Sequence, residues 1–447
     1  MAASVMMFTA GIRERVARAA VLSGALATGI ATIMATLVLA PASRTVTLTS
    51  WIIVLSAALL SVVSLVPAMP GVEEPDMSRA ERFDERTHMF ARANLATHPK
   101  LWEAHHRLFP EHRAVDERIR PLPELGMPGG RFYDRAISPM AEAAFSILER
   151  SYPALAPRPH RDRGITDPKE LAQVIELAAR RWGAADIGFT STRPYHWYSH
   201  AGRQAADWGE VIEPTHTTAI VIVVRMDFHT IRMAPAAPVL AESSRQYVEA
   251  AKIAHLVAEL LALNGYEARA HVDARYRVLC VPLAHDAGLG RVGRLGIFMH
   301  HRYGPCVRLS VVTTNAELPP TSGNHAYMEH FCRICKKCAD NCPSRSIPHG
   351  DKPASRGFPH WSIDQESCYS FWRRIGTDCS ICIASCPFTK PDALIHRLVR
   401  TYIRRNRINQ RLALLGDDLF YGRHLKVRAH NPTLKEVARR WMNASPS

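Results

Sequence analysis

Eight of the ten cysteines in this 447-residue chain lie close together near its C-terminal end, and they constrain its fold more than any other feature. They form two runs that each end in Cys-Pro: Cys332, Cys335, Cys338 and Cys342, then Cys368, Cys379, Cys382 and Cys386. The first run has the C-x2-C-x2-C-x3-C-P spacing of bacterial ferredoxins, in which the fourth cysteine ligates the other cluster. The spacing therefore predicts two 4Fe-4S clusters and a role in electron transfer.

The same crossover rule predicts which cysteines hold which cluster. One cluster takes Cys332, Cys335, Cys338 and Cys386, and the other takes Cys342, Cys368, Cys379 and Cys382. Zinc is an alternative occupant, although it usually binds two separate C-x-x-C pairs. Structural disulfides are a second alternative, disfavoured because cytosolic thiols are kept reduced. The remaining cysteines, Cys280 and Cys306, are expected to be unreactive small hydrophobic residues.

Two uncharged stretches near the N-terminus predict a transmembrane hairpin of two helices. Residues 19–42 are about long enough to span the hydrocarbon core, and residues 51–69 begin with an interfacial tryptophan. A cleaved signal peptide is the alternative, disfavoured because the first stretch exceeds the usual apolar region of such a signal. Arg13, Arg15 and Arg18 precede the first helix, and Glu14 interrupts any twin-arginine signal. We therefore expect a multi-pass protein of the inner membrane with a cytoplasmic catalytic domain.

A net charge of +15 suits an anionic partner, and part of this charge is concentrated in the C-terminal tail. Six arginines lie in one predicted helical stretch: Arg397, Arg400, Arg404, Arg405, Arg407 and Arg411. Such a helix can lie on anionic lipid, and a solvated helix face is an equally weighted alternative. Membrane lipid is therefore an expected partner, and nucleic acid is not.

Helix and strand patterns alternate over residues 166–325. Asp167 can cap a helix that has Pro168 at its first position, and residues 218–224, 266–272 and 307–314 predict strands. A second helix is predicted over about 244–264, with Ser243 and Gln246 as its capping box and Gly265 after its end. The preceding residues, 73–165, are polar and rich in Pro and His, and they are predicted to form a linker with some helix.

A glycine-rich loop follows within this region. Its candidate contact residues are Gly288, Leu289, Gly290, Gly293 and Gly296. Glycines allow the backbone to approach a bulky ligand closely. A nucleotide is not supported, because no lysine-threonine pair follows the loop and no evident acidic ribose ligand lies about 20 residues on.

Residues 167–390 resemble the cobalamin-dependent reductive dehalogenases and, more distantly, epoxyqueuosine reductase. The resemblance rests on several short elements followed by both cysteine runs: Ala185-Asp-Ile-Gly188, Leu263-Asn-Gly-Tyr266, Ala287-Gly-Leu-Gly290, Gly293-Arg-Leu-Gly296, Tyr303-Gly-Pro305, Val307-Arg-Leu309 and Thr313-Thr-Asn315. It implies an α+β fold, in which a nitroreductase-like α/β corrinoid-binding core precedes a ferredoxin-type domain with two 4Fe-4S clusters. The expected domains are a membrane anchor (1–72), a linker or helical region (73–165), a corrinoid- and substrate-binding domain (166–325), the cluster domain (326–392) and a basic tail (393–447).

The resemblance also implies site residues. Tyr247 occupies the place of the family's proton donor, and Arg308 that of its cationic partner. A guanidinium lowers the pKa of a neighbouring tyrosine, as does a position in the first turn of a helix, where we expect Tyr247. The alternatives are that Tyr247 packs in the core and that Arg308 bridges a carboxylate. The glycine loop is a candidate to contact the corrin, and Trp197 and Tyr198 are candidates to line a substrate pocket.

The predicted function is reductive dehalogenation of a small-molecule organohalide. Cobalamin and two 4Fe-4S clusters would supply electrons from an unidentified donor, and Tyr247 would supply the proton. One alternative is another corrinoid reductase of the epoxyqueuosine reductase kind. The other is a membrane-bound iron–sulfur electron carrier without cobalamin.

Overall fold

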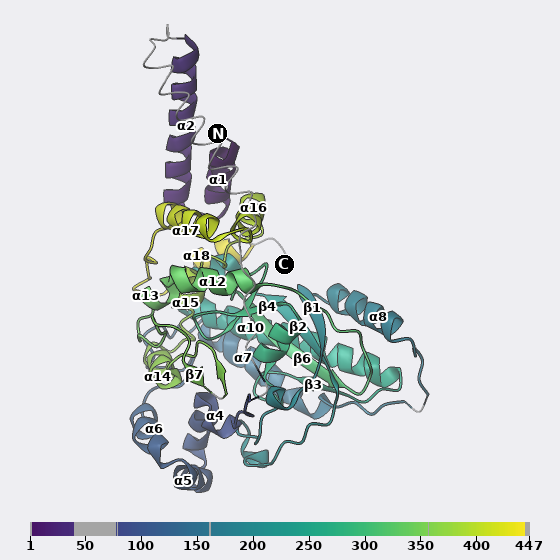
Figure 1. The fold of residues 1–447 in the computed structure, drawn as a ribbon. Coiled ribbons are helices and arrows are strands. Elements are labelled where there is room, and N and C mark those ends of the chain that lie inside the picture. The colour runs from purple at the N-terminus through teal and green to yellow at the C-terminus, as the bar shows by residue number, and fades with distance from the viewer. Residues whose placement is uncertain (1, 40–76, 78, 161, 356, 443–447) are drawn as a thin grey trace. The chain divides into compact units, whose positions relative to one another are not determined.

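The computed structural model describes residues 2–39, 77, 79–160, 162–355 and 357–442 (Figure 1). The second predicted transmembrane stretch, residues 51–69, lies outside the described residues. The chain divides into two compact units. The smaller contains Met1–Glu73, Ala326–Lys337 and Lys390–Leu425, and the larger contains Glu74–His325, Cys338–Thr389 and Lys426–Ser447.

The larger unit is built on a four-stranded antiparallel sheet with the strand order β1-β2-β6-β3. Its strands are β1 (Asp186–Ser191), β2 (Thr218–Arg225), β6 (Val307–Thr314) and β3 (Ala268–His271). The predicted strands 218–224 and 307–314 are confirmed nearly to the residue. Both are central in the sheet, and their apolar runs are typical of strands buried on both faces.

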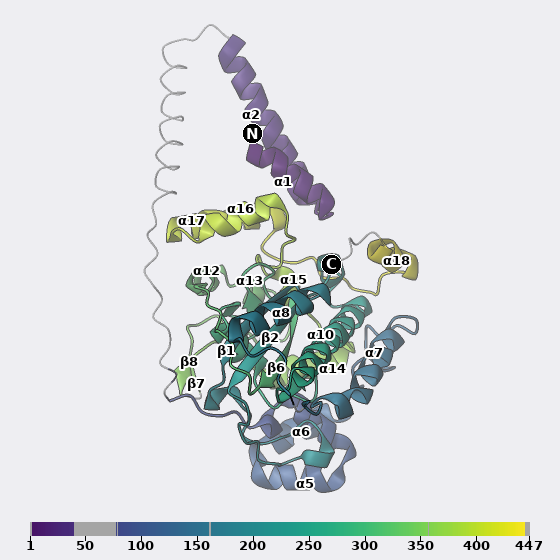
Figure 2. The same cartoon turned by 90° about the vertical axis from the view of Figure 1, so that its right-hand side faces the viewer.

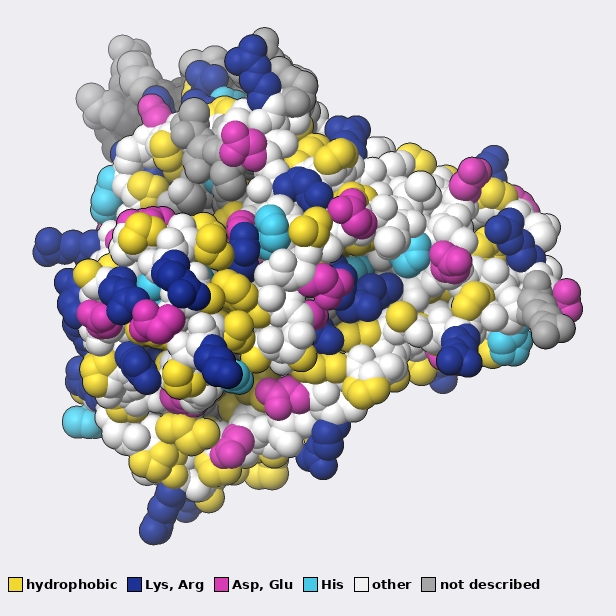
Figure 3. Space-filling model, turned by 90° about the horizontal axis from the view of Figure 1, so that it is seen from below, with side chains coloured by type: hydrophobic (Ala, Val, Ile, Leu, Met, Phe, Trp, Pro, Cys, Tyr) yellow, Lys and Arg dark blue, Asp and Glu magenta, His cyan; other side chains and the backbone are white. Residues whose placement is uncertain are grey.

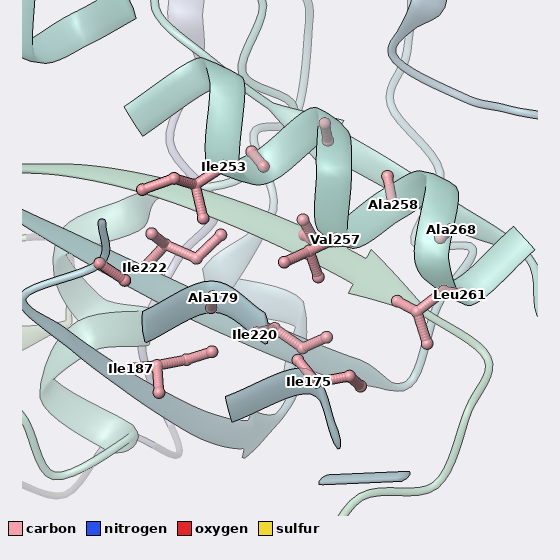
Figure 4. Close-up of a cluster of buried hydrophobic side chains, with 14 of the residues drawn as sticks. Ile175, Ala179, Ile187, Ile220, Ile222, Ile253, Val257, Ala258, Leu261 and Ala268 are labelled. Carbon is pink, nitrogen blue, oxygen red and sulfur yellow. The ribbon is translucent and has the colours of Figure 1, made fainter. Parts of the chain in front are cut away.

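Helices cover both faces of this sheet. The helices α8 (Pro168–Arg181) and α10 (Ala237–Leu263) lie on one face, where Ile175, Ile220 and Val257 point toward one another (Figure 4). On the other face, α11 (Cys280–Asp286) packs against the alternate residues of β2, including Val221. The helix α7 (Ser138–Arg150) packs along α10.

The helix α8 begins as predicted, whereas α10 begins seven residues earlier than expected. Asp167 caps α8 by accepting a hydrogen bond from the Lys169 amide. The predicted capping box of α10 is wrong, because Ser243 and Gln246 both lie inside the helix. The added turns are small and apolar, and Ala237 and Ala241 pack against Ile137 and Val437. Tertiary packing therefore extends the helix beyond its local start signal.

The described part of residues 73–165 folds into α4 (Met89–Asn94), α5 (Pro99–Leu108), α6 (Arg113–Ile119) and α7. Its polar residues are paired rather than solvated. Arg92 is buried and forms ion pairs with Asp116 and Glu366, each at 2.7 Å, and His106 lies 3.0 Å from Asp116. The segment is polar because its buried side chains form ion pairs with one another. Composition alone therefore suggested a linker where the chain is folded.

Further short elements complete the larger unit. These are α9 (Phe228–Ile231), the hairpin β4 (Gly290–Val292) and β5 (Phe298–His300), the pair β7 (Ala354–Ser355) and β8 (Phe358–Pro359), α14 (Gln365–Ile375), α15 (Ile381–Ser385) and α18 (Leu434–Met442). The helix α13 runs from Lys337 to Asp340.

In the smaller unit, α1 (Ala2–Arg13) folds back along α2 (Ala17–Leu39) (Figures 1 and 2). Among the described helices, only α2 is long and apolar enough to cross a membrane, over Ala17–Ala35. The remaining helices are α12 (Ala326–Cys335), α16 (Leu394–Ile403) and α17 (Arg407–Tyr421). The six tail arginines were predicted on one helix, but they are spread over α16, α17 and the turn at Arg404 and Arg405 between them. The stretch is divided because Asn406 caps a new helix by accepting a hydrogen bond from the Asn409 amide.

Candidate active site

Tyr247 and Arg308 meet between α10 and the central strand β6, as the resemblance implied. The Arg308 guanidinium carbon lies 5.0 Å from the centre of the Tyr247 ring. A cation at this distance over an aromatic face is attracted by the ring quadrupole. The two groups are therefore in contact, through the ring rather than through a hydrogen bond to the hydroxyl.

Arg308 also contacts the loop that precedes a cysteine of the second run. Its Nη2 donates to the Ser243 hydroxyl and to Asp378 Oδ2, the latter at 3.3 Å. Both members of the ion pair are nearly buried, with exposed side-chain fractions of 14% and 6%. Asp378 directly precedes Cys379. Arg308 thus bridges a carboxylate and in doing so connects Tyr247 to a predicted cluster ligand.

The pKa of Tyr247 is raised to about 12, because burial outweighs the opposing effect of the Arg308 charge. The expectation of a lowered pKa is therefore wrong. The helix dipole does not help either, because Tyr247 lies almost three turns inside α10 and the dipole acts mainly within the first turn. With this pKa the tyrosine keeps its proton at neutral pH. Among the described residues its hydroxyl has no hydrogen-bond partner, and it is not sealed from solvent.

Three further residues, Tyr276, Cys280 and Tyr198, lie near Tyr247. The sequence analysis gave no role in the site to Tyr276 or Cys280. The Tyr276 hydroxyl donates to the Leu309 carbonyl at 3.3 Å, beside Arg308. Burial raises the pKa of Tyr276 far above its usual value, and the charges of Cys280, Tyr247 and Tyr198 add to this shift. The sequence indicated only Tyr198 as a site residue, because Tyr276 lies in an irregular segment after β3 and Cys280, the first residue of α11, resembles a small core residue. Trp197 is a core residue, 1% exposed.

Four thiols of the larger unit lie close enough to affect one another's ionisation, and these are the four that we assigned to one cluster. Burial and then the charge of Cys342 raise the pKa of Cys368 to about 12. Cys382 likewise has a pKa of about 12, raised by burial and then by Cys368 and Cys342. The pKa of Cys379 is raised by burial and by Cys382 and Cys368. A metal site that replaces the proton on each thiol suits such a group.

None of the ten cysteines forms a disulfide. Within the described part of the larger unit, no three thiol sulfurs lie within 4.8 Å of one another. Zinc at 2.3 Å from each sulfur would draw them to about 3.8 Å apart. The choice of an iron–sulfur cubane over zinc therefore continues to rest on the spacing of the sequence motif.

The other four predicted ligands are divided between the units. Cys332 and Cys335 lie one turn apart on α12, and burial is the main cause that raises the pKa of Cys335 to about 12. Cys338 and Cys386 are buried in the larger unit. The assignment of these four to one cluster continues to rest on the sequence motif.

The glycine loop forms the hairpin of β4 and β5, packed against other parts of the protein. A Cβ on Gly290 would lie 2.0 Å from the Met299 carbonyl oxygen. Gly288 has a φ of +70°, and its Cβ would lie 2.3 Å from the Gly323 nitrogen. Gly293 and Gly296 are similarly enclosed. Protein packing alone thus accounts for these glycines, and their contact with a corrin stays a prediction.

Residues 331–390 match the family of 4Fe-4S dicluster domains. This match includes all eight cysteines of the two runs. The class that the fold and this match define is a protein with an α/β core, which carries Tyr247 and Arg308, followed by a 4Fe-4S dicluster domain.

The curated relatives and solved structures make this class more specific. Tetrachloroethene reductive dehalogenase of Desulfitobacterium hafniense is 34% identical over 205 residues, which cover 43% of this chain and 37% of the relative. The enzyme of the same name from Sulfurospirillum multivorans is 30% identical over 292 residues, 58% of each chain. The chain therefore spans about two fifths to three fifths of the length of these relatives.

Two solved structures share the fold. The catabolic reductive dehalogenase NpRdhA, in complex with 3-bromo-4-hydroxybenzoic acid, is 21% identical with a TM-score of 0.65 over 80% of this chain and 49% of its own. A reductive dehalogenase described with a mechanism for B12-dependent dehalogenation is 23% identical, with a TM-score of 0.64 over 78% of this chain and 48% of its own. This protein is thus homologous to reductive dehalogenases and has their fold, which confirms the predicted fold class.

Proposed function

We propose that this protein is a reductive dehalogenase that replaces a halogen of an organohalide with hydrogen. Two electrons and one proton enter for each carbon–halogen bond that is broken, and the halide leaves as an anion. In this proposal residues 166–325 bind the corrinoid and the substrate, and residues 326–392 carry both clusters. The observation that carries the proposal is the protonated Tyr247 beside Arg308, whose guanidinium donates to Asp378 on the loop that leads to Cys379.

Cobalamin fits this site. When bound, it would supply the low-valent cobalt that accepts the electrons from the clusters and reduces the substrate. Buried polar atoms near Tyr247 have no partner among the described residues, notably Arg308 Nε and Asp378 Oδ1. Unsatisfied buried atoms are costly, so a bound molecule that pairs with them is favoured.

The residues of the chain would perform three tasks. Tyr247 would deliver the proton from its hydroxyl, and Arg308 would stabilise the phenolate that remains. Ser243 and Asp378 hold the Arg308 guanidinium in place. A bound substrate that excludes water from the Tyr247 hydroxyl would strengthen the attraction between the phenolate and the guanidinium.

The Tyr247→Phe variant tests the proton-donor role. Phenylalanine keeps the ring under Arg308 and removes only the hydroxyl. We expect halide release from a panel of halogenated phenols to fall roughly 100-fold or more, as for the loss of a general acid. The visible spectra of the clusters and of cobalamin should stay unchanged. Full turnover by this variant would reject Tyr247 as the donor.

We also propose that the protein is attached to the inner membrane through its N-terminal helices, with the catalytic domain on the cytoplasmic side. The apolar helix α2 supports this attachment, and α17 packs against it within the same unit, where Arg18 donates to the Leu419 carbonyl at 2.8 Å. A second spanning helix over residues 51–69 would return the chain to the same side.

The helices α16 and α17 present an apolar stripe to solvent within that unit. Its exposed residues lie at helical spacing: Leu394 and Leu398, then Ile408, Leu412, Leu415 and Leu419. Exposed arginines flank them, namely Arg397, Arg404, Arg407 and Arg411. This combination suits a helix pair that lies in the interface of an anionic membrane.

Membrane fractionation and protease access test this arrangement. We expect the full chain to stay in the membrane pellet through an alkaline carbonate wash. A protease added to intact spheroplasts should leave residues 73–447 uncut and should cut them after lysis, because the arginines before α2 keep that side cytoplasmic. Cleavage in intact spheroplasts would place the catalytic domain outside.

A further inference from the structure

A hollow in the larger unit is lined by an unusual number of arginines. Its cavity volume is about 10 Å³, and the space free of atoms is about 230 Å³ when open solvent is included. Arg203, Arg269, Arg275 and Arg277 line it, together with Tyr276 and the two acidic residues Glu85 and Asp207. Burial raises the pKa of Glu85 to about 7, so this carboxyl is only partly ionised at neutral pH.

Two of these arginines form no ion pair within the described residues, although the Arg203 guanidinium lies 5.1 Å from the centre of the Phe90 ring. Arg275 pairs with Asp207 at 2.6 Å and Arg277 with Glu210 at 2.8 Å. Arg203 and Arg269 form no side-chain hydrogen bond or ion pair within the described residues, and the Nε atom of each is buried without a partner. Burial and the charges of Arg277 and Arg275 lower the pKa of Arg269 to about 10. An anion between these guanidinium groups would reduce their mutual repulsion and would accept hydrogen bonds from the unpaired donors.

The hollow adjoins the candidate active site through Tyr276. The side chain of Tyr276 lines the hollow, and its hydroxyl is bonded to the carbonyl of Leu309, next to Arg308. The charge of Arg203 also acts on the ionisation of Tyr247. A molecule whose halogen lies near Tyr247 can therefore place another group beside the arginines.

We propose that Arg203 and Arg269 bind an oxyanion carried by the substrate, so that the organohalide is a halogenated organic acid. The planar forks of two guanidinium groups match the paired oxygens of a carboxylate. The identification of the ligand as a substrate rests on the proposed dehalogenase function. The site itself is a property of the arginines and can be measured without turnover.

Calorimetry on the cobalamin-loaded full chain separates binding from catalysis. The probe is 4-hydroxybenzoate, which has the carboxylate but no halogen, and phenol is its uncharged counterpart. We expect 4-hydroxybenzoate to bind at least about tenfold more tightly than phenol, and Arg203→Gln or Arg269→Gln to remove that advantage. Arg181→Gln, an exposed arginine on α8, is the matched control and should bind as the unaltered protein does.

Further arms of the same experiment separate the possible sources of the oxyanion. Unchanged cobalamin and iron content in both variants would support a substrate site. Loss of cobalamin would instead show that the arginines hold a phosphate of the cofactor, and it would overturn the proposal. Inorganic phosphate that competes as well as 4-hydroxybenzoate, or equal binding of phenol, would also overturn it. Arg269→Lys retains the charge without the fork, and we expect it to bind more tightly than Arg269→Gln if both variants fold.

Discussion

At the scale of single residues, the site depends on partners that the sequence could only partly indicate. The pairing of Tyr247 with Arg308 was predictable, because short motifs on both sides place the two residues in a known pattern. The sign of the pKa shift at Tyr247 was not predictable. It depends on how deeply the ring is buried and on where α10 begins, and both are properties of tertiary packing.

Ionisation of Tyr247 provides a test at this scale. A raised pKa means that the folded protein favours the protonated phenol, so this preference stabilises the fold below about pH 10 and is lost as the pH approaches 12. The phenolate absorbance of the protein minus that of Tyr247→Phe should therefore show a mostly protonated tyrosine at about pH 11. Arg308→Gln should raise the midpoint further, because Arg308 lowers this pKa. A midpoint at or below 10 would contradict the burial that we describe.

At the scale of elements, the sequence predicts a helix or strand well when its own residues carry the signals that start and end it. The cap at Asp167 and the apolar runs of β2 and β6 are of this kind. The start of α10 and the folding of residues 79–160 are not, since both depend on contacts with distant segments such as Val437 and Glu366. The glycine loop shows the same limit, because glycine is required there for packing that no sequence pattern reveals.

Gly290→Ala separates the two roles of that loop. The added Cβ would lie 2.0 Å from a backbone oxygen of β5, which cannot move without distorting the hairpin. We expect a loss of about 3 kcal/mol in the free energy of unfolding, measured by denaturant titration. Gly350→Ala, which meets no atom within 4 Å, should be nearly neutral. If Gly290→Ala keeps its stability but loses cobalamin, the loop contacts the corrin and packing is not the reason for the glycine.

At the scale of the whole molecule, charge is informative only where it is localised. The chain has a net charge of +15, yet basic and acidic side chains are interspersed over the face shown in Figure 3. The arginines that carry our inferences lie instead in a defined hollow and beside the apolar stripe of α16 and α17. The sequence predicts the cluster ligands, the proton donor and the membrane helix, whereas the arginine-lined hollow became apparent only in three dimensions.

The most direct test of the central claim is halide release by the full chain. The protein is purified without oxygen, loaded with cobalamin, and reduced in the presence of halogenated phenols and halogenated hydroxybenzoates. We predict one halide and one hydrogenated product for every two electrons consumed. Intact clusters and bound cobalamin, with no halide released from any of these compounds, would contradict the assignment as a reductive dehalogenase.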